Sequence, residues 1–306
     1  MLDLKLIRSQ PEEIAENCRK RNVHVDIEKL LELDEQVRQI TTEVDSVRQR
    51  RNEISKEMKG KIPSDERQPL IEESKNLRNE ESEKESFLHE LVEQRLNLLK
   101  QVPNLTHPDS PEGLTDEDNM PIREVGTIRK FDFEPKDHLE LMEALDLIDF
   151  DGGAKVSGQK FYYLKNQAVF LELALAQYAL GLLQKEGFTV HMTPDLARSQ
   201  ILDGIGFSPR GEETQIYSLE DSDLCLIATA EITLGGLLAD QVLKADQLPI
   251  LYAGFSHCYR TEAGAAGRES RGLYRVHQFS KIEMFAFTHP EKSEEMHEKM
   301  REIEEQ

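Results

Sequence analysis

Apolar residues recur at alternating spacings of three and four between residues 30 and 58. The apolar members of this stripe are Leu30, Leu33, Val37, Ile40, Val44, Val47, Ile54 and Met58. Arg51 is the one polar residue on it. A heptad repeat sustained over about four repeats predicts a long helix that packs against a partner helix. The preceding residues 1–26 predict a short helical segment, because Pro11 and the acidic Glu12 and Glu13 favour a first helical turn.

A second helical segment follows a break in this pattern. The residues that interrupt the stripe are Gly60, Pro63, Ser64 and Asp65. Helix breakers and turn formers in close succession predict a turn. Apolar positions resume from about Arg67 and are Leu70, Leu77, Leu88, Leu91 and Leu98, with Glu81 and Lys84 weakening the middle. Two helices of similar length joined by a short turn predict an antiparallel coiled coil with its tip near residues 60–66.

The composition changes after this second segment. Residues 102–121, VPNLTHPDSPEGLTDEDNMP, are rich in Pro, Asp and Gly and predict a linker. From about residue 121 the pattern is mixed, with short strand-like pieces, apolar helices and glycine breaks. We therefore place a domain boundary near residue 110, with a helical arm over 1–110 and an α+β domain over 111–306.

The longest apolar stretch lies in the second domain. A helix is predicted from Ala168 to about Lys185, followed by a short strand that ends at Pro194. The helix contains Glu172 and is too short to span a membrane. The stretch therefore predicts a buried helix or a helix that faces a second copy of the chain.

The net charge bears on whether the chain can bind nucleic acid, and the cysteine content bears on its cellular compartment. The net charge is -21, which repels nucleic acid on average, so RNA binding requires a local basic patch. One candidate cluster consists of Arg48, Arg50, Arg51, Lys56, Lys59 and Lys61. It fits phosphate contacts and a solvated helix face equally well. The three cysteines fit neither a disulfide framework nor a zinc site, and residues 1–11 do not predict a signal peptide, so we expect a cytoplasmic protein.

Two stretches of the second domain carry candidate chemistry. In residues 224–236, LCLIATAEITLGG, an apolar run leads into Thr229, Ala230 and Glu231. A carboxylate at this point could hold an ammonium group, although these residues alone fit an exposed strand end better. Residues 250–287 predict two strands joined by a loop over 263–274 that is rich in Gly, Ala and Arg. Long loops of such composition are usually functional.

Strand alternation gathers polar residues on one face of this hairpin. Arg260 and Glu262 share a face of the first strand, and Arg275, Phe279 and Glu283 share a face of the second. Arginine forks can bind phosphate, phenylalanine can stack on a base, and glutamate can hold an amine or hydroxyl. The alternative is a solvated face with offsetting ion pairs. Because GAAGRES lacks the Gly-Lys-Ser/Thr ending of a P-loop, a phosphate site here would rest on arginine.

The segment YRTEAGAAGRESRGLYRVHQFSKIEMF resembles the second signature motif of class II aminoacyl-tRNA synthetases in its bacterial seryl-tRNA synthetase form. Residues 229–231 are similar to that family's serine-binding loop, and the helix–strand unit ending at Pro194 is similar to the first class II motif, at the dimer interface. VPNLTHP, FYYLKNQAVFLELALAQYAL and the two-helix arm also resemble the family. The resemblance covers the whole chain and implies an antiparallel coiled-coil arm followed by a class II antiparallel-sheet catalytic domain.

The resemblance also implies the site residues. The ATP-binding residues would be Arg260, Thr261, Glu262, Arg275, Val276 and Phe279, and the catalytic ones Arg260, Glu262 and Arg275. Arg260 would hold the α-phosphate, Glu262 the adenine amino group and Phe279 the adenine ring. The residues around serine would be Thr229, Ala230, Glu231 and Glu283. The loop 263–274 would respond to ATP and to the acceptor end of tRNA.

The reaction implied by the resemblance has two steps. The carboxylate of serine attacks the α-phosphorus of ATP and releases pyrophosphate, and the terminal ribose hydroxyl of tRNA(Ser) then attacks the acyl carbonyl. Positioning, together with arginine and Mg²⁺ charge, can supply the rate without a protein nucleophile. Hydrogen bonds to the serine hydroxyl would reject alanine. The arm would reach the long variable arm of tRNA(Ser), and the enzyme would be a cytoplasmic homodimer.

The chain departs from the family at one point. Family members carry a third motif, with an arginine on the ATP γ-phosphate, and an acidic magnesium ligand. This sequence reaches Gln306 without either, so no metal ligand is assigned and we interpret the sequence as incomplete. One alternative is a non-catalytic paralogue that binds tRNA or a protein partner. The other is a coiled-coil interaction protein with a degenerate α/β domain.

Overall fold

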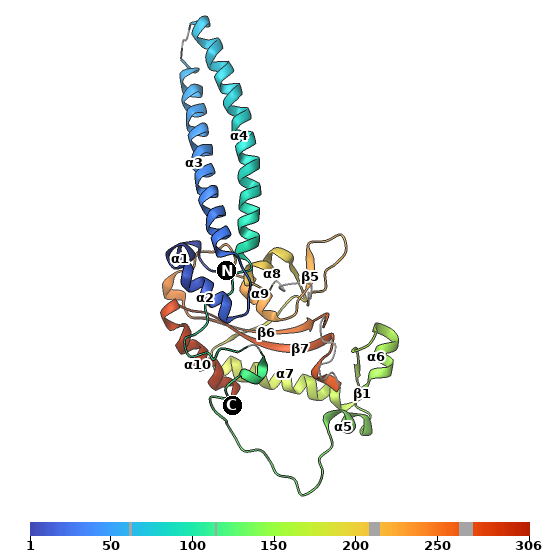
Figure 1. The fold of residues 1–306 in the computed structure, drawn as a ribbon. Coiled ribbons are helices and arrows are strands. Elements are labelled where there is room, and N and C mark those ends of the chain that lie inside the picture. Colours follow the sequence, from blue (N-terminus) through green and yellow to red (C-terminus); the bar gives the residue numbers. More distant parts are fainter. Residues whose placement is uncertain (61–62, 114, 208–214, 263–271) are drawn as a thin grey trace. The chain divides into compact units, whose positions relative to one another are not determined.

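The structure, a computed structural model, describes residues 1–60, 63–113, 115–207, 215–262 and 272–306. It divides into two compact units, Met1–Ile122 and Arg123–Gln306 (Figure 1). The boundary near residue 110 that we propose from composition lies in the irregular stretch at the end of the first unit.

Two long helices, α3 (Ile27–Glu57) and α4 (Ser64–Leu99), form an antiparallel arm in the first unit (Figure 1). Asp26 caps α3 by accepting a hydrogen bond from the Lys29 N–H at 2.8 Å. The predicted apolar seam is confirmed, and its buried members are Leu30, Leu33, Val37, Val44, Val47, Ile54 and Leu91. The second helix begins at Ser64, directly after Pro63 and before the predicted start near residue 67. Helix ends are the least certain part of a pattern-based prediction.

A polar layer interrupts the seam midway along the arm. Arg51 donates to the Glu81 carboxylate, and the Arg48 Nε donates to its other oxygen at 3.1 Å. The hydrogen bond from Arg51 lowers the pKa of Glu81 below its ordinary value. The one polar residue of the predicted stripe is therefore paired across the seam, because α4 places an acid opposite it. A charged pair within an apolar seam acts mainly on the register of the two helices.

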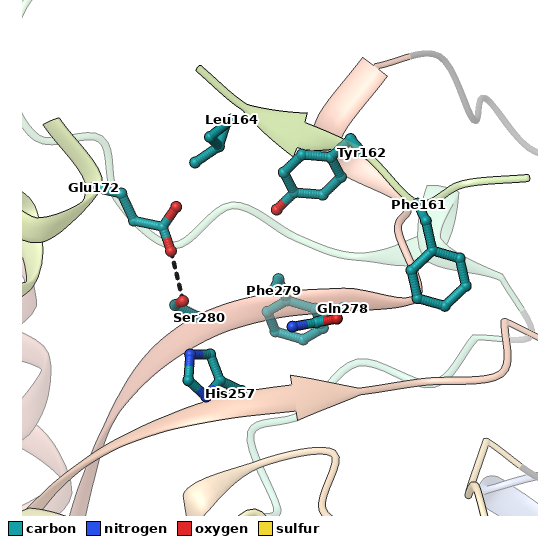
Figure 2. A pocket seen from close by; sticks show the side chains of 8 residues that line it. All are labelled: Phe161, Tyr162, Leu164, Glu172, His257, Gln278, Phe279 and Ser280. Atoms are coloured by element: carbon teal, nitrogen blue, oxygen red, sulfur yellow. Dashed lines mark hydrogen bonds between the residues drawn. The ribbon is translucent and has the colours of Figure 1, made fainter. Parts of the chain in front are cut away.

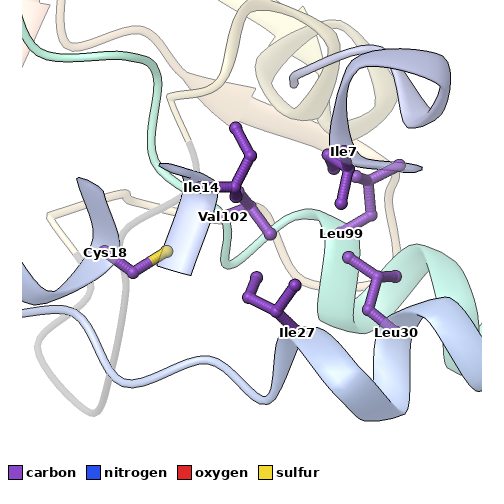
Figure 3. Close-up of a cluster of buried hydrophobic side chains, with 7 residues drawn as sticks. All are labelled: Ile7, Ile14, Cys18, Ile27, Leu30, Leu99 and Val102. Atoms are coloured by element: carbon purple, nitrogen blue, oxygen red, sulfur yellow. The ribbon is translucent and has the colours of Figure 1, made fainter. Parts of the chain in front are cut away.

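Two short helices, α1 (Leu4–Ser9) and α2 (Pro11–Lys20), pack against the root of the arm and confirm the helical start of the chain. Figure 3 shows the core that they share with α3 and α4, formed by Ile7, Ile14, Cys18, Ile27, Leu30, Leu99 and Val102. The Asn17 side chain accepts from the Thr106 N–H at 2.9 Å and donates to the Asn104 carbonyl at 3.2 Å. The segment after the arm is thereby tied back onto α2.

The second unit contains a three-stranded sheet in the order β3-β6-β7. Strands β6 (Ile250–Tyr259) and β7 (Gln278–Phe287) are antiparallel, and β3 (Thr189–Met192) runs parallel to β6 at its other edge. The predicted hairpin is therefore confirmed. Two small antiparallel ladders join β1 (Ile148–Asp149) to β2 (Tyr163–Leu164), and β4 (Leu196–Arg198) to β5 (Leu224–Leu226).

Helices pack on both faces of this sheet (Figure 1). On one face lies α7 (Gln167–Lys185), where Leu183 belongs to a cluster with Ala253 of β6 and Ile282 of β7. On the other face lies α9 (Ala230–Gly236). The other α-helices of the unit are α5 (His138–Ala144), α6 (Phe150–Ser157), α8 (Ser199–Ile205) and α10 (Ser293–Glu304). Its short 3₁₀ turns are η2 (Ala245–Gln247), η3 (Gly272–Tyr274) and η4 (Pro290–Lys292), and the first unit has η1 (Asp116–Asp118).

The close approach of α9 to the sheet depends on Gly254 of β6. A Cβ atom at this position would lie 2.9 Å from the Leu234 Cδ1 and 3.0 Å from the Ala230 Cβ, both in α9. Any larger residue would push the helix off the strand. The glycine therefore lets the start of α9 reach the polar face of the hairpin.

The predicted mixture of short strands and helices is confirmed for the second unit, but it begins later than residue 121. Residues 119–137 are irregular, and Ile122 and Ile128 are 93% and 92% exposed. Apolar residues alone make no strand without a neighbouring strand to pair with.

Of the two alternatives predicted for α7, full burial within the chain is contradicted. Its exposed apolar residues are Val169, Phe170, Leu171, Leu173, Leu175 and Tyr178. Exposed apolar residues in such number are typical of an interface, so the alternative of a helix that faces a second copy stays a prediction.

Candidate functional site

The predicted polar face of the hairpin forms, although its arginines lie outside the strands. Cross-strand pairing of Cys258 with Phe279, and of Gly254 with Glu283, places both site residues of β7 on the sheet face that α9 covers. The first strand ends at Tyr259, before Arg260, and the chain leaves the extended conformation at Glu262, whose φ is 52°. Arg275 likewise precedes β7.

Arg260 stays beside the hairpin although it follows β6. Its N–H donates to the His277 carbonyl at 3.0 Å, and the His277 Nδ1 donates to the Arg260 carbonyl at 2.8 Å. The Arg260 guanidinium carbon lies 5.1 Å from the centre of the Phe279 ring. Its Nε is buried and has no hydrogen-bond partner among the residues that the structure describes. A buried donor without a partner is available to an anionic ligand.

Glu262 and Arg275 form a second contact at the same end of the hairpin. The Arg275 Nη1 donates to the Glu262 Oε2 at 2.7 Å, and the Glu262 side chain is only 9% exposed. The Glu262 N–H donates to the Gln215 Oε1 at 3.0 Å, and the Thr261 N–H donates to the Gln215 carbonyl at 3.2 Å. The segment around Gln215 therefore fixes the chain after β6, and nothing in the sequence pattern indicated it.

The residues assigned to serine lie together farther along the hairpin. The Thr229 hydroxyl donates to the Glu283 Oε2 at 2.8 Å. It also caps α9 by accepting from the Glu231 N–H at 3.1 Å, and Thr229 is 1% exposed. The interpretation of residues 229–231 as an exposed strand end is thus wrong. Lys281, two residues before Glu283 on the same strand face, forms an ion pair with it.

The charge balance around Glu283 is negative. Burial raises the pKa of the Glu231 carboxyl, the nearby Glu283 carboxylate raises it further, and Lys281 opposes both effects. Two carboxylates therefore share one lysine. An added ammonium group would lower this repulsion, so the arrangement is suited to the amino group of an amino acid.

Two further residues assigned to the site, Ala230 and Val276, are buried. Ala230 is fully buried at the start of α9, and Val276 is 5% exposed just before β7. The sequence did not single out Lys281, although period-two alternation between Phe279 and Glu283 was a signal that could have found it. Nor did it single out His277, whose ring stacks on Phe161 with 5.1 Å between centroids.

A cavity of about 240 Å³ opens beside Phe279 (Figure 2). Its lining residues are Phe161, Tyr162, Leu164, Glu172, His257, Gln278, Phe279 and Ser280. The Ser280 hydroxyl donates to the Glu172 Oε1 at 2.5 Å, and the His257 Nδ1 lies 3.1 Å from the Asp195 carboxylate. Glu172 of α7 and Ser280 lie on the other sheet face from the Phe279 ring, so this cavity is not the space in which a ligand would stack on that ring. The ring itself contacts Arg260. A cation–π contact is worth only about 0.5–1 kcal/mol at a partly exposed site, so a planar ligand could displace the guanidinium.

The described residues offer no protein cage for a metal ion. No group of three or more His, Cys, Asp or Glu side chains converges within them. The same residues include no helix long and apolar enough to cross a bilayer.

The two faces of the arm differ in charge. On α3, Arg48, Asn52 and Ser55 recur at helical spacing and form one stripe, and Lys59 follows in the turn just after the helix. A hollow of about 450 Å³ is lined by residues of this stripe and by Ser74 of α4, so the α4 stripe with Arg67, Ser74 and Arg78 lies on the same side. We define the basic face of the arm by the cations Arg48, Lys59, Arg67 and Arg78; it also carries Asp45, Glu81 and Glu85, all three of which pair with Arg48.

The opposite, acidic face carries the remaining ion pairs. Arg50 donates to Glu73 at 2.8 Å, and Lys84 pairs with Glu43. The acids of this face are Glu43, Glu53, Glu57, Glu73 and Glu80. The candidate phosphate cluster is therefore divided: Arg48, Arg50 and Arg51 are held by glutamates, Lys56 and Lys59 are exposed, and Lys61 lies outside the described residues.

Two predicted segments also fall partly outside the described residues. They are the tip of the arm at 61–62 and residues 263–271 of the hairpin loop.

Comparisons with known protein families cover both units. Residues 1–106 match the seryl-tRNA synthetase N-terminal domain, and residues 215–306 match the tRNA synthetase class II core domain (G, H, P, S and T). The serine–tRNA ligase of Treponema denticola is 48% identical over 306 residues, and that of Rubrobacter xylanophilus is 51% identical over the same length. In both comparisons the whole chain is covered, and it spans 72% of the relative.

Solved structures give the same result. The seryl-tRNA synthetase of Pyrococcus horikoshii complexed with ATP is similar, with a TM-score of 0.82 and 37% identity over 99% of this chain and 73% of that one. The cytoplasmic serine–tRNA ligase of Naegleria fowleri in complex with AMP is similar, with a TM-score of 0.77 and 29% identity over 99% of this chain and 71% of that one.

Proposed function

The chain belongs to the seryl-tRNA synthetase family, and we propose that its hairpin site activates serine with ATP for transfer to tRNA(Ser). In the first step a serine carboxylate oxygen bonds to the α-phosphorus, the bond to the bridging oxygen breaks, and pyrophosphate leaves. In the second step the ribose hydroxyl at the 3′ end of tRNA attacks the seryl carbonyl, and AMP leaves.

One observation carries this proposal, namely the Thr229–Glu283 hydrogen bond beside Glu231 on the sheet face that also holds Phe279. Glu231 and Glu283 would hold the ammonium group of serine, because two carboxylates share one lysine there. Thr229 fixes Glu283 in place. Residues 279 and 283 are about 13 Å apart at 3.3 Å per residue, a span that lets one strand hold both ends of an aminoacyl-adenylate.

The nucleotide half of the site would use the residues at the end of the hairpin. Phe279 would stack on adenine once Arg260 moves from the ring to the α-phosphate, for which its buried Nε is available. Glu262 would accept a hydrogen bond from the adenine amino group and Arg275 would lie against the nucleotide, so the ion pair between them sets the orientation of both.

We assign no described residue to Mg²⁺. This ion commonly binds through substrate phosphates and one or two carboxylates, and the described residues supply no cluster of their own for it. Mg²⁺ would add positive charge on the ATP phosphates. Arg260 would supply charge from the protein at the α-phosphate.

The arm would bind tRNA through its basic face. The acidic face repels phosphate, whereas Lys59 and Arg78 are exposed on the basic face and have no acidic partner among the described residues. Such contacts read the backbone and shape of RNA, which fits the long variable arm of tRNA(Ser).

Two further properties complete the proposal. The exposed apolar face of α7 would be covered by a second copy of the chain in a homodimer, because a surface of this kind is costly in water. The enzyme would act in the cytoplasm, where the three buried thiols stay reduced.

The test is the amino-acid dependence of pyrophosphate exchange into ATP by the native protein. We expect exchange with serine and a rate at least about 10³-fold lower with alanine, because the polar groups around the hydroxyl are then left unpaired. Exchange that is absent with every amino acid, together with intact tRNA binding, would favour the non-catalytic paralogue.

A further inference from the structure

A buried carboxylate joins three helices at the root of the arm. The Asp34 side chain, in α3, is 3% exposed. Arg95 of α4 donates to its Oδ1 at 2.8 Å. The Nε of Arg38, one turn along α3, lies 3.3 Å from the Oδ2, and the Nε of Arg8 of α1 lies 3.6 Å from the same oxygen. Both are ion pairs without a hydrogen bond: the Oδ2 has no hydrogen-bond partner among the described residues, and the Arg8 Nε donates to the Leu4 carbonyl at 3.2 Å. One aspartate thus ties α1 and both helices of the arm together.

Apolar contacts at the same level do not fix the direction of the arm. Leu33, Val37 and Leu91 form a cluster between α3 and α4, and Ile7 of α1 packs against Leu30. Such contacts are non-directional, so helices can rotate or slide while keeping them. The hydrogen bond from Arg95 to Asp34 is directional, because the guanidinium donors are fixed in one plane. Arg38 and Arg8 add attraction between charges, which holds α1 close to the buried carboxylate.

The length of the arm amplifies any freedom at its root. From Asp34 to Glu57 the helix rises about 35 Å at 1.5 Å per residue. A rotation of about 10° at the root would move that end by about 6 Å, twice the length of a hydrogen bond. Over such a range, tRNA bound to the basic face could not at the same time keep contacts made outside the arm.

We propose that Asp34, with Arg8, Arg38 and Arg95, is a clamp that sets the direction in which the arm leaves α1, and that Asp34 is a positioning residue for tRNA binding. This inference rests on the proposed role of the arm in binding tRNA. It assigns no contact with tRNA to Asp34 itself, which is buried.

The direct test measures the distance from α1 to the arm. Spin labels at Lys5→Cys in α1 and Gln49→Cys in α3 report it, because both sites are exposed and the native cysteines are buried. We expect one narrow distance distribution in the parent and a distribution at least twofold wider with Asp34→Asn. The matched control is Glu32→Gln, which removes a carboxylate whose partner Lys29 lies within α3. Equal widths in parent and Asp34→Asn would overturn the clamp.

The functional test is the Kd for tRNA(Ser) of the same variants. Asp34→Asn should raise Kd about tenfold, whereas Glu32→Gln should change it less than twofold. Removing a negative charge strengthens general attraction to RNA, so weaker binding cannot be a charge effect. Serine-dependent pyrophosphate exchange should stay unchanged.

Two further variants distinguish a folding defect, an error in the proposed clamp and an error in the proposed role of the arm. If Asp34→Asn does not fold, Arg95→Lys keeps the charge but loses the planar fork, and it should widen the distribution to an intermediate degree; no widening would overturn the clamp. If shortening the arm abolishes tRNA binding while Asp34→Asn binds normally, only the clamp is overturned. If shortening the arm also leaves binding normal, the proposed role of the arm fails.

Discussion

Arg260→Ala is expected to lower serine-dependent pyrophosphate exchange about 10³-fold, the upper range for removing one preorganised donor at a developing charge. The Arg260 backbone is held by two hydrogen bonds to His277, and its Nε has no partner among the described residues, so the side chain is positioned without being neutralised. The loss should fall mainly on kcat. Removal of the guanidinium also frees the Phe279 ring for adenine, which limits any rise in the KM for ATP.

Two further variants serve as controls for Arg260→Ala. Arg198→Ala removes an exposed arginine of the same unit that lies 4.0 Å from Asp223, and it should leave exchange within about twofold. Arg260→Lys keeps the charge but not the fork, so it should recover part of the rate. Exchange by Arg260→Ala within threefold of the parent, in a folded protein, would remove Arg260 from the mechanism.

Shortening the arm is expected to separate the two steps of the reaction. Replacing residues 42–86 by a short glycine–serine turn keeps the root cluster of Leu33, Val37 and Leu91 and the Asp34–Arg95 contact. Pyrophosphate exchange should stay within about twofold, because the hairpin site lies in the other unit. Charging of tRNA(Ser) should fall at least about 10³-fold, since several phosphate contacts are lost together. Normal charging by the shortened protein would contradict the assignment of the arm.

Single substitutions test which face of the arm binds tRNA(Ser). Arg78→Gln, on the basic face, should raise the Kd for tRNA(Ser) and reduce the slope of log K against log salt by about one, as expected for one phosphate contact. Arg50→Gln, on the acidic face and paired with Glu73, is the matched control and should leave that slope unchanged. The reverse pattern would place tRNA on the acidic face.

The elements with a strong period were predictable from the sequence. The seam from Leu30 to Ile54 and the hairpin of β6 and β7 follow from spacing alone, because each periodicity reports one buried face. The segment around Ile128 has no such period. Its apolar residues Ile122, Val125, Ile128 and Phe131 recur at every third position, which matches neither a strand nor a helix face, and the segment is irregular.

The candidate site was predictable only in part. Phe279 and Glu283 were placed on one face by strand alternation, whereas the contact between Thr229 and Glu283 joins positions 54 residues apart. That contact depends on the close approach of α9 at Gly254, a tertiary feature that no local pattern encodes. The same holds for Gln215, which binds Glu262 from a distant loop, and for Asp34, whose burial depends on arginines from three helices.

Binding of a non-hydrolysable seryl-adenylate analogue, measured by calorimetry, tests the central claim most directly, because it requires the serine and nucleotide halves of the site at once without a chemical step. We expect saturable one-to-one binding by the parent, binding at least about 10²-fold weaker for the alanyl analogue, and loss of this difference in Glu283→Ala. If the folded protein does not bind the analogue, or binds the seryl and alanyl analogues equally well, the hairpin is not a serine-activating site.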